Sequence, residues 1–317
     1  MSSMIRSLAL ISLTLLAFQP VTAEQFTLRV GVDLVNVLFS VTDRNGRFVS
    51  GLGPEDFRVE EDGDPQEITY FARENELPLT LALLVDTSPS VGPVFEEEKR
   101  TAVSFLSTTL RAEDLALVIG FDRDVTLFQD FTENSDLLGT AVHALEIGSG
   151  TSIYDAILLA SEERLRAEAG RKAIILISDG EDTTSRISRN EALIAAHQAD
   201  AIIYSISNAL PRRGGFFGGG GGGGDMGALE RLSEETGGTV YQLESDSRFE
   251  EIFAQIADEL RSQYSLGYFS TNSEGDGEYR EIEIIPVNRD HRVRARRGYY
   301  ASIGANEDQP VEAEENR

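Results

Sequence analysis

The sequence predicts an α/β fold: a doubly wound, mostly parallel sheet with helices on both faces, flanked by a small antiparallel β unit. Three observations lead to this prediction. Residues 79–85 (LTLALLV) form a short, almost wholly apolar run, typical of a strand buried on both faces of a parallel sheet. From about Pro78 onward, such runs alternate with helical stretches. On either side of this region, alternating apolar and polar residues predict antiparallel strands.

Further elements of the α/β region follow from the same patterns. Strands are expected at residues 115–121, 125–128, 173–177, 201–206 and 239–243. The first two are close enough in sequence to form an antiparallel hairpin at the edge of the sheet. Apolar residues on one helical face indicate helices that begin near Ile153 and near Phe249. Ser188-x-x-Glu191 and Ser247-x-x-Glu250 resemble capping boxes, which open helices.

The flanking β unit is predicted from two segments that lie far apart in the sequence. In residues 24–77, an alternating run ends at the turn Asn45-Gly46, and the turn Asp62-Gly63 joins residues 57–60 to residues 68–71. After the α/β region, strands are expected at residues 264–269, 281–287 and 293–300. Neither segment forms a large core alone, so we expect the two to pack together, with the α/β region inserted between them.

The two ends of the chain differ from the rest. Residues 1–23 carry one charge, Arg6, an apolar core and the small-residue sequence Val21-Thr22-Ala23, which predict a cleaved signal peptide; an uncleaved amino-terminal anchor is the alternative. Residues 302–317 are acidic and lack a core pattern, so we expect a disordered tail. The predicted division is a signal peptide (1–23), an amino-terminal β segment (24–77), an α/β domain (78–262), a carboxy-terminal β segment (263–301) and an acidic tail (302–317).

Charge and composition exclude several classes of function. The 317 residues include 54 acidic and 28 basic side chains, a net charge of −26, and loss of Arg6 with the signal peptide would make it −27. Such a surface repels nucleic acid and anionic lipid and attracts cations. The chain has no cysteine, which excludes disulfides, thiol chemistry and attachment of lipid through cysteine.

Three groups of oxygen-bearing side chains are predicted to meet at one edge of the sheet. Asp86, Ser88 and Ser90 follow the first buried strand, Thr151 precedes a helix, and Asp179 follows the strand at residues 173–177. Ligands of open α/β sheets collect beyond the carboxyl ends of the strands, and carboxylate and hydroxyl oxygens suit a hard cation such as Mg²⁺. Asp, Ser and Pro are also common turn and cap residues, so the first group alone would equally fit a structural role.

With all five positions filled, residues 78–262 resemble the von Willebrand factor type A domain with its metal-ion-dependent adhesion site. The family motif D-x-S-x-S is matched by residues 86–90 (DTSPS), its second-loop threonine by Thr151 and its third-loop aspartate by Asp179. The flanking segments, among them residues 32–37 (VDLVNV) and 263–268 (QYSLGY), are similar to an exported bacterial subgroup with this domain.

The resemblance implies a site and a function. Ser88 and Ser90 would ligate Mg²⁺ directly, with Mn²⁺ or Ca²⁺ as alternatives, and Asp86, Thr151 and Asp179 would ligate it directly or through water. One coordination position would remain for an Asp or Glu carboxylate of a protein partner. The protein would then be an exported, non-enzymatic module for adhesion or assembly, located in the periplasm or outside the cell.

Two other functions stay open at this point. A metal-dependent hydrolase could use Asp86 as nucleophile or ligand, although the chain has no G-x-S-x-G or H-E-x-x-H motif and Ser88 has no evident histidine partner. A structural envelope protein with a vestigial, metal-free site is the other alternative.

Several further residues have simpler interpretations. The glycine-rich run 214–224 is either a flexible insertion or a mobile segment beside the ion, whose Phe216 and Phe217 would contact a partner. Asp155 is expected to interact favourably with the dipole of its helix. Glu181 and Asp182 are expected only to add negative electrostatic potential. Asp122 and Asp124 are expected to serve the hairpin turn. Surface or packing roles are predicted for the scattered histidines His143, His197 and His291.

Overall fold

The computed structural model describes residues 34–73, 77–209, 224–243, 249–272 and 274–301. The predicted signal peptide, the acidic tail, Ser247 and all of the glycine-rich run except Gly224 therefore lie outside the described residues. The proposed domain boundaries stay predictions. Among the helices of the described segments, none has the length and apolar character that crossing a bilayer requires.

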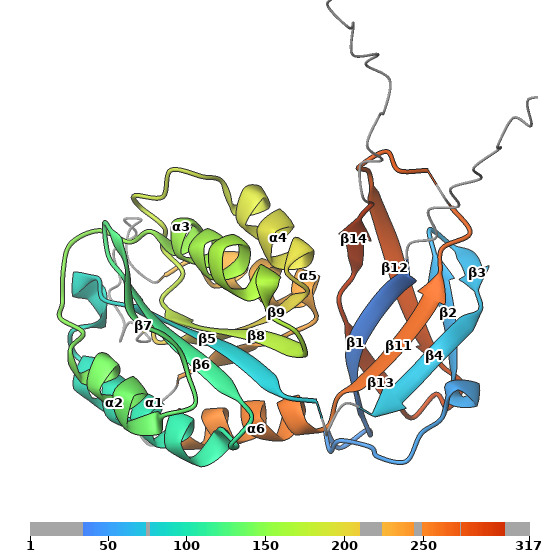
Figure 1. Ribbon diagram of the computed structural model, residues 1–317, viewed down its shortest axis with the longest axis horizontal. Coiled ribbons are helices and arrows are strands. Elements are labelled where there is room, and N and C mark those ends of the chain that lie inside the picture. The colour runs from blue at the N-terminus through green and yellow to red at the C-terminus, as the bar shows by residue number, and fades with distance from the viewer. Residues whose placement is uncertain (1–33, 74–76, 210–223, 244–248, 273, 302–317) are drawn as a thin grey trace, which may run out of the picture. The chain divides into compact units, whose positions relative to one another are not determined.

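A six-stranded sheet forms the centre of the α/β region, with the strand order β10-β9-β8-β5-β6-β7 (Figure 1). Its strands are β5 (Leu79–Asp86), β6 (Leu115–Phe121), β7 (Val125–Thr132), β8 (Arg171–Ser178), β9 (Ala201–Ser207) and β10 (Val240–Gln242). All neighbouring strands are parallel except β6 and β7, which form the antiparallel edge hairpin expected from the sequence. The predicted fold class is therefore confirmed.

Strand β5 lies inside this sheet, between β8 and β6, and all eight of its residues are buried. Leu81, Leu83 and Val85 contribute to one apolar cluster, whereas Ala82 and Leu84 contribute to a second. Because successive side chains of a strand point to opposite faces, the two clusters lie on the two faces of the sheet. The uninterrupted apolar run of β5 follows from burial on both sides.

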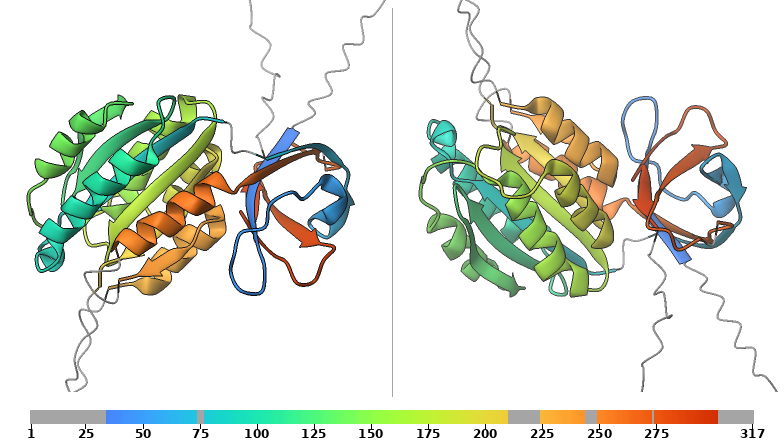
Figure 2. Two further views of the ribbon diagram at one scale, coloured as in Figure 1. Left: turned by 90° about the horizontal axis from the view of Figure 1, so that it is seen from below. Right: turned by 90° about the horizontal axis from the view of Figure 1, so that it is seen from above.

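Helices cover both faces of the sheet (Figure 2). The first cluster is completed by α1 (Phe95–Thr109), α2 (Ser135–His143) and α6 (Phe249–Arg261). The second is completed by α3 (Ile153–Leu158), α4 (Arg189–Gln198) and α5 (Met226–Thr236). Helix α3 continues into a π-helical turn (Leu159–Arg164) and a short 3-10 turn (Leu165–Ala167).

The capping box predicted at the start of α4 is present. The Ser188 hydroxyl accepts a hydrogen bond from the Glu191 backbone N–H (3.3 Å), and the Glu191 carboxylate accepts one from the Ser188 N–H (2.8 Å). These two bonds satisfy backbone donors that the first turn of a helix otherwise leaves unpaired. They fix the point at which the loop after β8 becomes a helix.

The remaining strands form two antiparallel four-stranded sheets, ordered β13-β1-β11-β4 and β14-β12-β2-β3. The strands are β1 (Leu34–Thr42), β2 (Phe57–Glu61), β3 (Asp64–Gln66), β4 (Ile68–Arg73), β11 (Tyr264–Phe269), β12 (Tyr279–Pro286), β13 (Arg292–Ala295) and β14 (Gly298–Tyr300). A 3-10 turn, Pro54–Asp56, precedes β2. Strands from before and after the α/β region pair in both sheets and share one apolar cluster.

Two details of this β unit differ from the sequence prediction. The turn at Asp62-Gly63 joins β2 to the short β3, not to β4, which crosses to the other sheet and pairs with β11. There Phe71 stacks on Phe57 of β2 across the core, with the ring centroids 5.8 Å apart. Phe57 is buried and Phe71 is partly buried, and packing these two rings between the sheets places β4 opposite β2, where a single hairpin would place the strands side by side. The predicted strand at residues 293–300 is likewise divided into β13 and β14, which belong to different sheets.

Candidate functional site

The five predicted ligands lie in three loops. Two of these loops follow the carboxyl ends of β5 and β8, and the other leads into α3. Asp86 is the last residue of β5, Thr151 lies two residues before α3, and Asp179 directly follows β8. Asp86, Ser88, Thr151 and Asp179 are buried, with Asp86 fully enclosed at 0% exposure, whereas Ser90 is exposed. A site built from these side chains therefore opens to solvent on the Ser90 side.

The first loop is organised around the Asp86 carboxylate. Its Oδ1 accepts a hydrogen bond from the Ser88 backbone N–H (2.8 Å), so Asp86 does act as a turn residue. Ser88 is the residue before the 3-10 turn Pro89–Val91, yet its hydroxyl does not cap that turn. The Ser88 and Ser90 hydroxyl oxygens lie 2.9 Å apart. Two hydroxyls and one carboxylate of the motif are thus held close together.

Hydrogen bonds connect each of the three loops to the other two. The Gly148 N–H donates to the Thr87 carbonyl (2.8 Å), which joins the second loop to the first. The Thr151 carbonyl accepts from the backbone N–H groups of Thr183 (2.9 Å) and Thr184 (3.0 Å), which joins the second loop to the third. The Ser178 hydroxyl donates to Asp86 Oδ2 (2.6 Å), which joins the third loop to the first.

Gly148 is required by the close approach of the second loop to the β6–β7 hairpin. A Cβ atom at this position would lie 1.7 Å from Asp122 Oδ2, so any other residue would displace either the Asp122 carboxylate or the loop. Asp122 Oδ2 accepts from the Ser149 N–H (2.8 Å) and its Oδ1 from the Asp124 N–H (3.0 Å). Asp122 therefore serves the hairpin turn, as predicted, and also anchors the second loop.

The charge of Asp86 has no cationic partner in the described part of the chain. Burial raises the pKa of Asp86 to about 6, since the low-dielectric interior disfavours the carboxylate, and the nearby Asp179 adds to the effect. The hydrogen bonds from Ser178 and Ser88 lower the pKa and offset only part of this cost. An ionised Asp86 in this position would be stabilised by a bound cation.

A second carboxyl group, Glu98 on α1, is buried near Asp86. Its Oε2 accepts a hydrogen bond from Asn208 Nδ2 (3.0 Å), while its Oε1 has no hydrogen-bond partner among the described residues. Burial raises the pKa of Glu98 well above its usual value, and the negative charge of Asp86 raises it further. Burial therefore favours the neutral form of Glu98.

Several oxygen atoms of the site are left without a protein partner. Among the described residues, Thr151 Oγ1 and Asp179 Oδ2 accept no hydrogen bond, and Asp179 Oδ1 accepts only the Glu181 N–H (3.0 Å). The described residues contain no cluster of three or more His, Cys, Asp or Glu side chains placed to hold a metal. The predicted set has only two carboxylates and relies on hydroxyls, a donor chemistry that suits a hard cation such as Mg²⁺.

Sequence reasoning missed hydrogen bonds that three residues near the site form. Ser178 binds Asp86 because β5 and β8 are neighbours with Val85 opposite Ile177, which places their last residues side by side. Asp182 was expected to add only negative field, but its Oδ1 accepts from the Ile153 N–H (2.8 Å) and holds the start of α3. Asp155 accepts from the Arg186 (2.9 Å) and Ile187 (3.3 Å) N–H groups, so it also has a structural role. Strand order and register would have revealed only the first.

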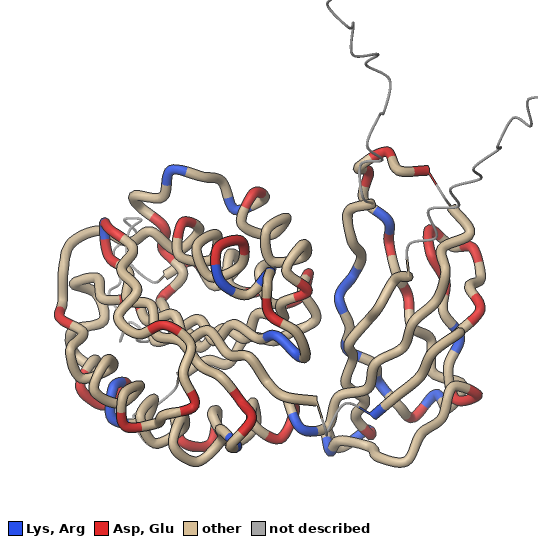
Figure 3. Tube along the Cα trace, in the orientation of Figure 1, with Lys and Arg blue, Asp and Glu red and all other residues tan. Residues whose placement is uncertain are grey.

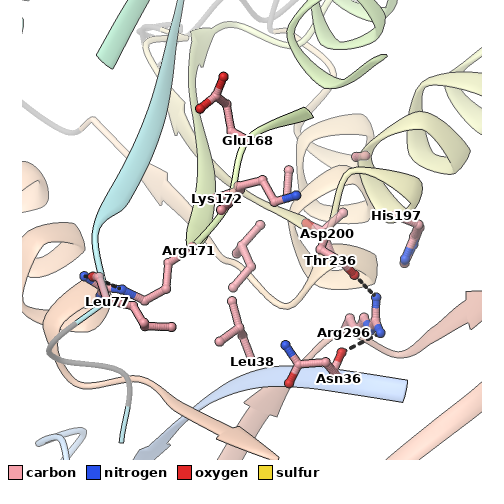
Figure 4. A pocket seen from close by; sticks show the side chains of 15 residues that line it. Asn36, Leu38, Leu77, Glu168, Arg171, Lys172, His197, Asp200, Thr236 and Arg296 are labelled. Carbon is pink, nitrogen blue, oxygen red and sulfur yellow. Dashed lines mark hydrogen bonds and ion pairs between the residues drawn. The ribbon is translucent and has the colours of Figure 1, made fainter. Parts of the chain in front are cut away.

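A cavity of about 200 Å³ lies at the opposite, amino-terminal end of β8 and β9 (Figure 4). Arg296 points into it and is engaged by the Asp200 carboxylate (2.8 Å) and the Asn36 carbonyl (2.6 Å). Arg171 donates to the Leu77 carbonyl. These contacts hold the β unit to the α/β region, so the cavity belongs to that junction and not to the candidate metal site.

Structure comparison finds several solved structures that are similar to part of this chain. BatB from Bacteroides thetaiotaomicron is 20% identical, with a TM-score of 0.46 over 57% of this chain and 98% of that chain. An aerotolerance-related membrane protein from Bacteroides fragilis is 17% identical, with a TM-score of 0.47 over 57% and 98% of the two chains. Proximal thread matrix protein 1 from the mussel byssus, with a zinc-occupied MIDAS motif, is 17% identical, with a TM-score of 0.49 over 62% and 48%.

Sequence comparison finds a curated relative and a family model that matches part of the chain. An uncharacterized protein of Borreliella burgdorferi is 23% identical over 190 residues, and the chain spans about half the length of this relative (54% of this chain and 55% of that protein are covered). The family model of the von Willebrand factor type A domain matches residues 81–181. That range contains all five candidate ligands, Asp86, Ser88, Ser90, Thr151 and Asp179, and so the match and the hydrogen-bonded loops concern the same part of the molecule.

Proposed function

We propose that this protein binds a divalent cation through Asp86, Ser88, Ser90, Thr151 and Asp179 and uses it to capture a carboxylate of a protein partner. Mg²⁺ is the expected ion, with Mn²⁺ and Ca²⁺ as alternatives. The protein would act outside the cytoplasm as an adhesion or assembly module, not as an enzyme. Von Willebrand factor type A domains commonly mediate metal-dependent protein interactions, which agrees with this assignment.

The observation that carries the proposal is the burial of Asp86 with no cationic side chain beside it in the described segments. A buried, uncompensated carboxylate destabilises a fold, so its presence needs a reason. A divalent cation supplies that reason, because it neutralises the ionised form that burial disfavours. The neighbouring Ser88 and Ser90 hydroxyls and the unpartnered oxygens of Thr151 and Asp179 offer further oxygen ligands of the kind that Mg²⁺ prefers.

Charge balance leads from the ion to the partner. Asp86 and Asp179 together would only neutralise a divalent cation, and any aspartate that binds through water leaves the ion short of anionic ligands. Ser90 is the exposed member of the set, so the open side of the site faces solvent. A carboxylate that arrives from this side would complete the coordination shell and supply negative charge. This chemistry selects an exposed Asp or Glu on another protein.

Thermal unfolding in Mg²⁺ and in EDTA tests the metal site. Free ligand at one hundred times its Kd adds about 2.7 kcal/mol to the free energy of unfolding, so Mg²⁺ is expected to raise the melting temperature of the wild type. The variant Asp86→Ala should lose this response. The matched variant Asp64→Ala removes an exposed aspartate on β3 and should keep it. An equal response in Asp86→Ala would show that the ion binds elsewhere.

Partner capture tests the second half of the proposal. The wild type and Asp86→Ala are each immobilised and tested in Mg²⁺ and in EDTA. Only the wild type in Mg²⁺ should retain a partner. Blocking the carboxylates of the captured partner should release it. Partner binding that persists in EDTA would contradict the metal-bridged mode, and phosphatase or esterase turnover lost in Asp86→Ala would favour a hydrolase.

A further inference from the structure

A groove of about 730 Å³ lies between the α3–α5 side of the α/β region and strands β12 and β14. We call it the tyrosine–arginine groove, and the lining residues used below are Tyr154, Arg189, His197, Arg231, Tyr279 and Tyr300. On the α/β side it is formed by α3, α4 and α5, which cover the second face of the sheet, and not by the three loops of the candidate metal site.

Aromatic rings form one wall of this groove. Tyr279 and Tyr300 are opposite each other on β12 and β14, and their rings meet at an angle of 65° with the centroids 5.2 Å apart. The His197 ring contacts both rings edge to face, at 6.4 and 6.2 Å. Tyr279 is nevertheless 36% exposed. Tyrosine is among the residue types that are enriched at the energetic centres of protein interfaces.

The charges of the groove are opposite to those of the molecule. The chain has a net charge of −26, and its acidic residues are spread along the described segments (Figure 3). The groove contains Arg189 and Arg231, and among the described residues neither side chain forms a hydrogen bond or an ion pair. Glu235, the acidic residue that also lines the groove, has a cation of its own, since Arg297 Nη1 lies 3.6 Å from it.

Folding does not explain the placement of these arginines. Arg189 is the first residue of α4, where the positive end of the helix dipole disfavours a cation. Arg231 is exposed on α5 and forms no ion pair with an acidic residue of the described segments. A guanidinium group donates paired hydrogen bonds to carboxylates, and it loses little hydration when it does so. Two uncompensated guanidinium groups beside tyrosine rings therefore fit a ligand that is both acidic and aromatic or apolar.

We propose that the tyrosine–arginine groove binds an acidic peptide segment of a partner protein, with carboxylates on Arg189 and Arg231 and an aromatic side chain against Tyr279 and Tyr300. This site is separate from the candidate metal site and goes beyond the function proposed above. Recognition would use direct contacts between arginine and carboxylate, and it would require no divalent cation.

Fluorescence polarisation with a labelled Glu-Glu-Tyr-Glu-Glu peptide, in EDTA, tests the groove independently of any metal. The double variant Arg189→Gln/Arg231→Gln should bind the peptide at least about tenfold more weakly than the full-length wild type, because a hydrogen bond to a charged group contributes roughly 1.5–3 kcal/mol. The matched control Arg58→Gln/Arg289→Gln removes two exposed arginines outside the groove and should bind like the wild type. Asp86→Ala should also bind like the wild type, so failure of the metal site would not affect this result.

Each other outcome overturns the proposal. Equal binding by the two double variants would show that the peptide responds to overall charge and not to the groove. Equal binding of a Gln-Gln-Tyr-Gln-Gln peptide would remove the role of the carboxylates. Binding that appears only after removal of residues 302–317 would identify the chain's own acidic segment as the occupant, in place of a partner. Melting temperatures of both double variants, measured beside the wild type, ensure that a loss of binding is not a loss of fold.

Discussion

Two buried carboxylates, in two regions of the molecule, are held in opposite ways. Glu259 on α6 is 1% exposed, and its two oxygens contact Arg294 Nη1 of β13 at 2.9 and 2.8 Å. The Ser40 hydroxyl of β1 donates a third bond (2.9 Å). Asp86 at the end of β5 is equally buried, but the hydrogen bonds it accepts from described residues come from neutral donors, Ser88 and Ser178.

The difference indicates what each carboxylate is for. Glu259 has its counter-charge inside the chain, so it can join α6 to the β unit without any ligand. No cation among the described residues offsets the cost of burying Asp86, which is the pattern expected where a bound cation is part of the functional state. The comparison would fail if the two carboxylates responded in the same way to neutralisation, and four measurements test it.

The largest effect is expected from neutralising Asp86 in the absence of metal. The pKa of Asp86 is raised from 3.8 to about 6 by folding, so the folded state holds the proton more tightly than the unfolded state. This contribution to stability is present below pH 3.8 and is lost as the pH rises through about 6. At neutral pH the ionised carboxylate therefore lowers the free energy of unfolding by about 3 kcal/mol, because each pKa unit corresponds to 1.36 kcal/mol. In EDTA, we expect the free energy of unfolding of Asp86→Asn to exceed that of the wild type by about 3 kcal/mol.

Urea unfolding at neutral pH and at about pH 4 measures this gain. The gain should disappear at the lower pH, where the wild-type carboxyl is itself protonated. Burial lowers the pKa of His197 to about 4, which destabilises both proteins as the pH falls below 6.5, and the difference between them removes this shared effect. A destabilised Asp86→Asn protein at neutral pH would contradict the uncompensated charge.

Removing Arg294, the cation beside Glu259, should instead lower the free energy of unfolding. Arg294→Met leaves Glu259 buried without its counter-charge, which costs roughly 3–5 kcal/mol for a fully buried pair. Because Arg294 is 40% exposed, water screens part of this interaction, and we expect a loss of about 2 kcal/mol in the free energy of unfolding. Mg²⁺ should not restore it. Unchanged stability in urea unfolding would mean that Glu259 needs no cation either.

The third effect is the pH dependence of metal affinity. Metal binding requires ionised Asp86, so protons compete with the cation below about pH 6. The Kd for Mg²⁺ should increase about tenfold for each further pH unit, or about 1.4 kcal/mol of binding free energy. Isothermal titration calorimetry across this range measures the dependence. A Kd that stays constant from neutral pH down to pH 5 would exclude Asp86 as a ligand that must lose its proton.

The smallest effect serves as the reference for both regions. Asp130 on β7 is 55% exposed and lies 3.4 Å from Arg164. Exposed ion pairs contribute little, because water and salt screen them, so Asp130→Asn should change the free energy of unfolding by less than about 0.5 kcal/mol. The change should be the same in Mg²⁺ and in EDTA. A larger change would mean that the unfolding assay responds to charge in general.

The sequence predicted those features that depend on local pattern. The apolar run of β5 specifies a strand buried on both faces, Ser188 and Glu191 specify a helix start, and the five motif positions indicate three polar loops. These predictions succeed because the interactions involved are local or follow from periodicity. The same reasoning failed for β4, since an Asp-Gly turn shows that the chain reverses but not which strand becomes the partner.

By itself, then, the sequence determined the layers of the α/β region and the residue types of its polar edge. Only the tertiary structure decided which groups meet: that Ser178 donates to Asp86, that Arg294 neutralises Glu259, and that Arg189 and Tyr279 line one groove. The reason is physical. Burial and charge compensation depend on neighbours brought from distant parts of the chain, and a carboxylate with a counter-ion has the same one-letter code as a carboxylate without one.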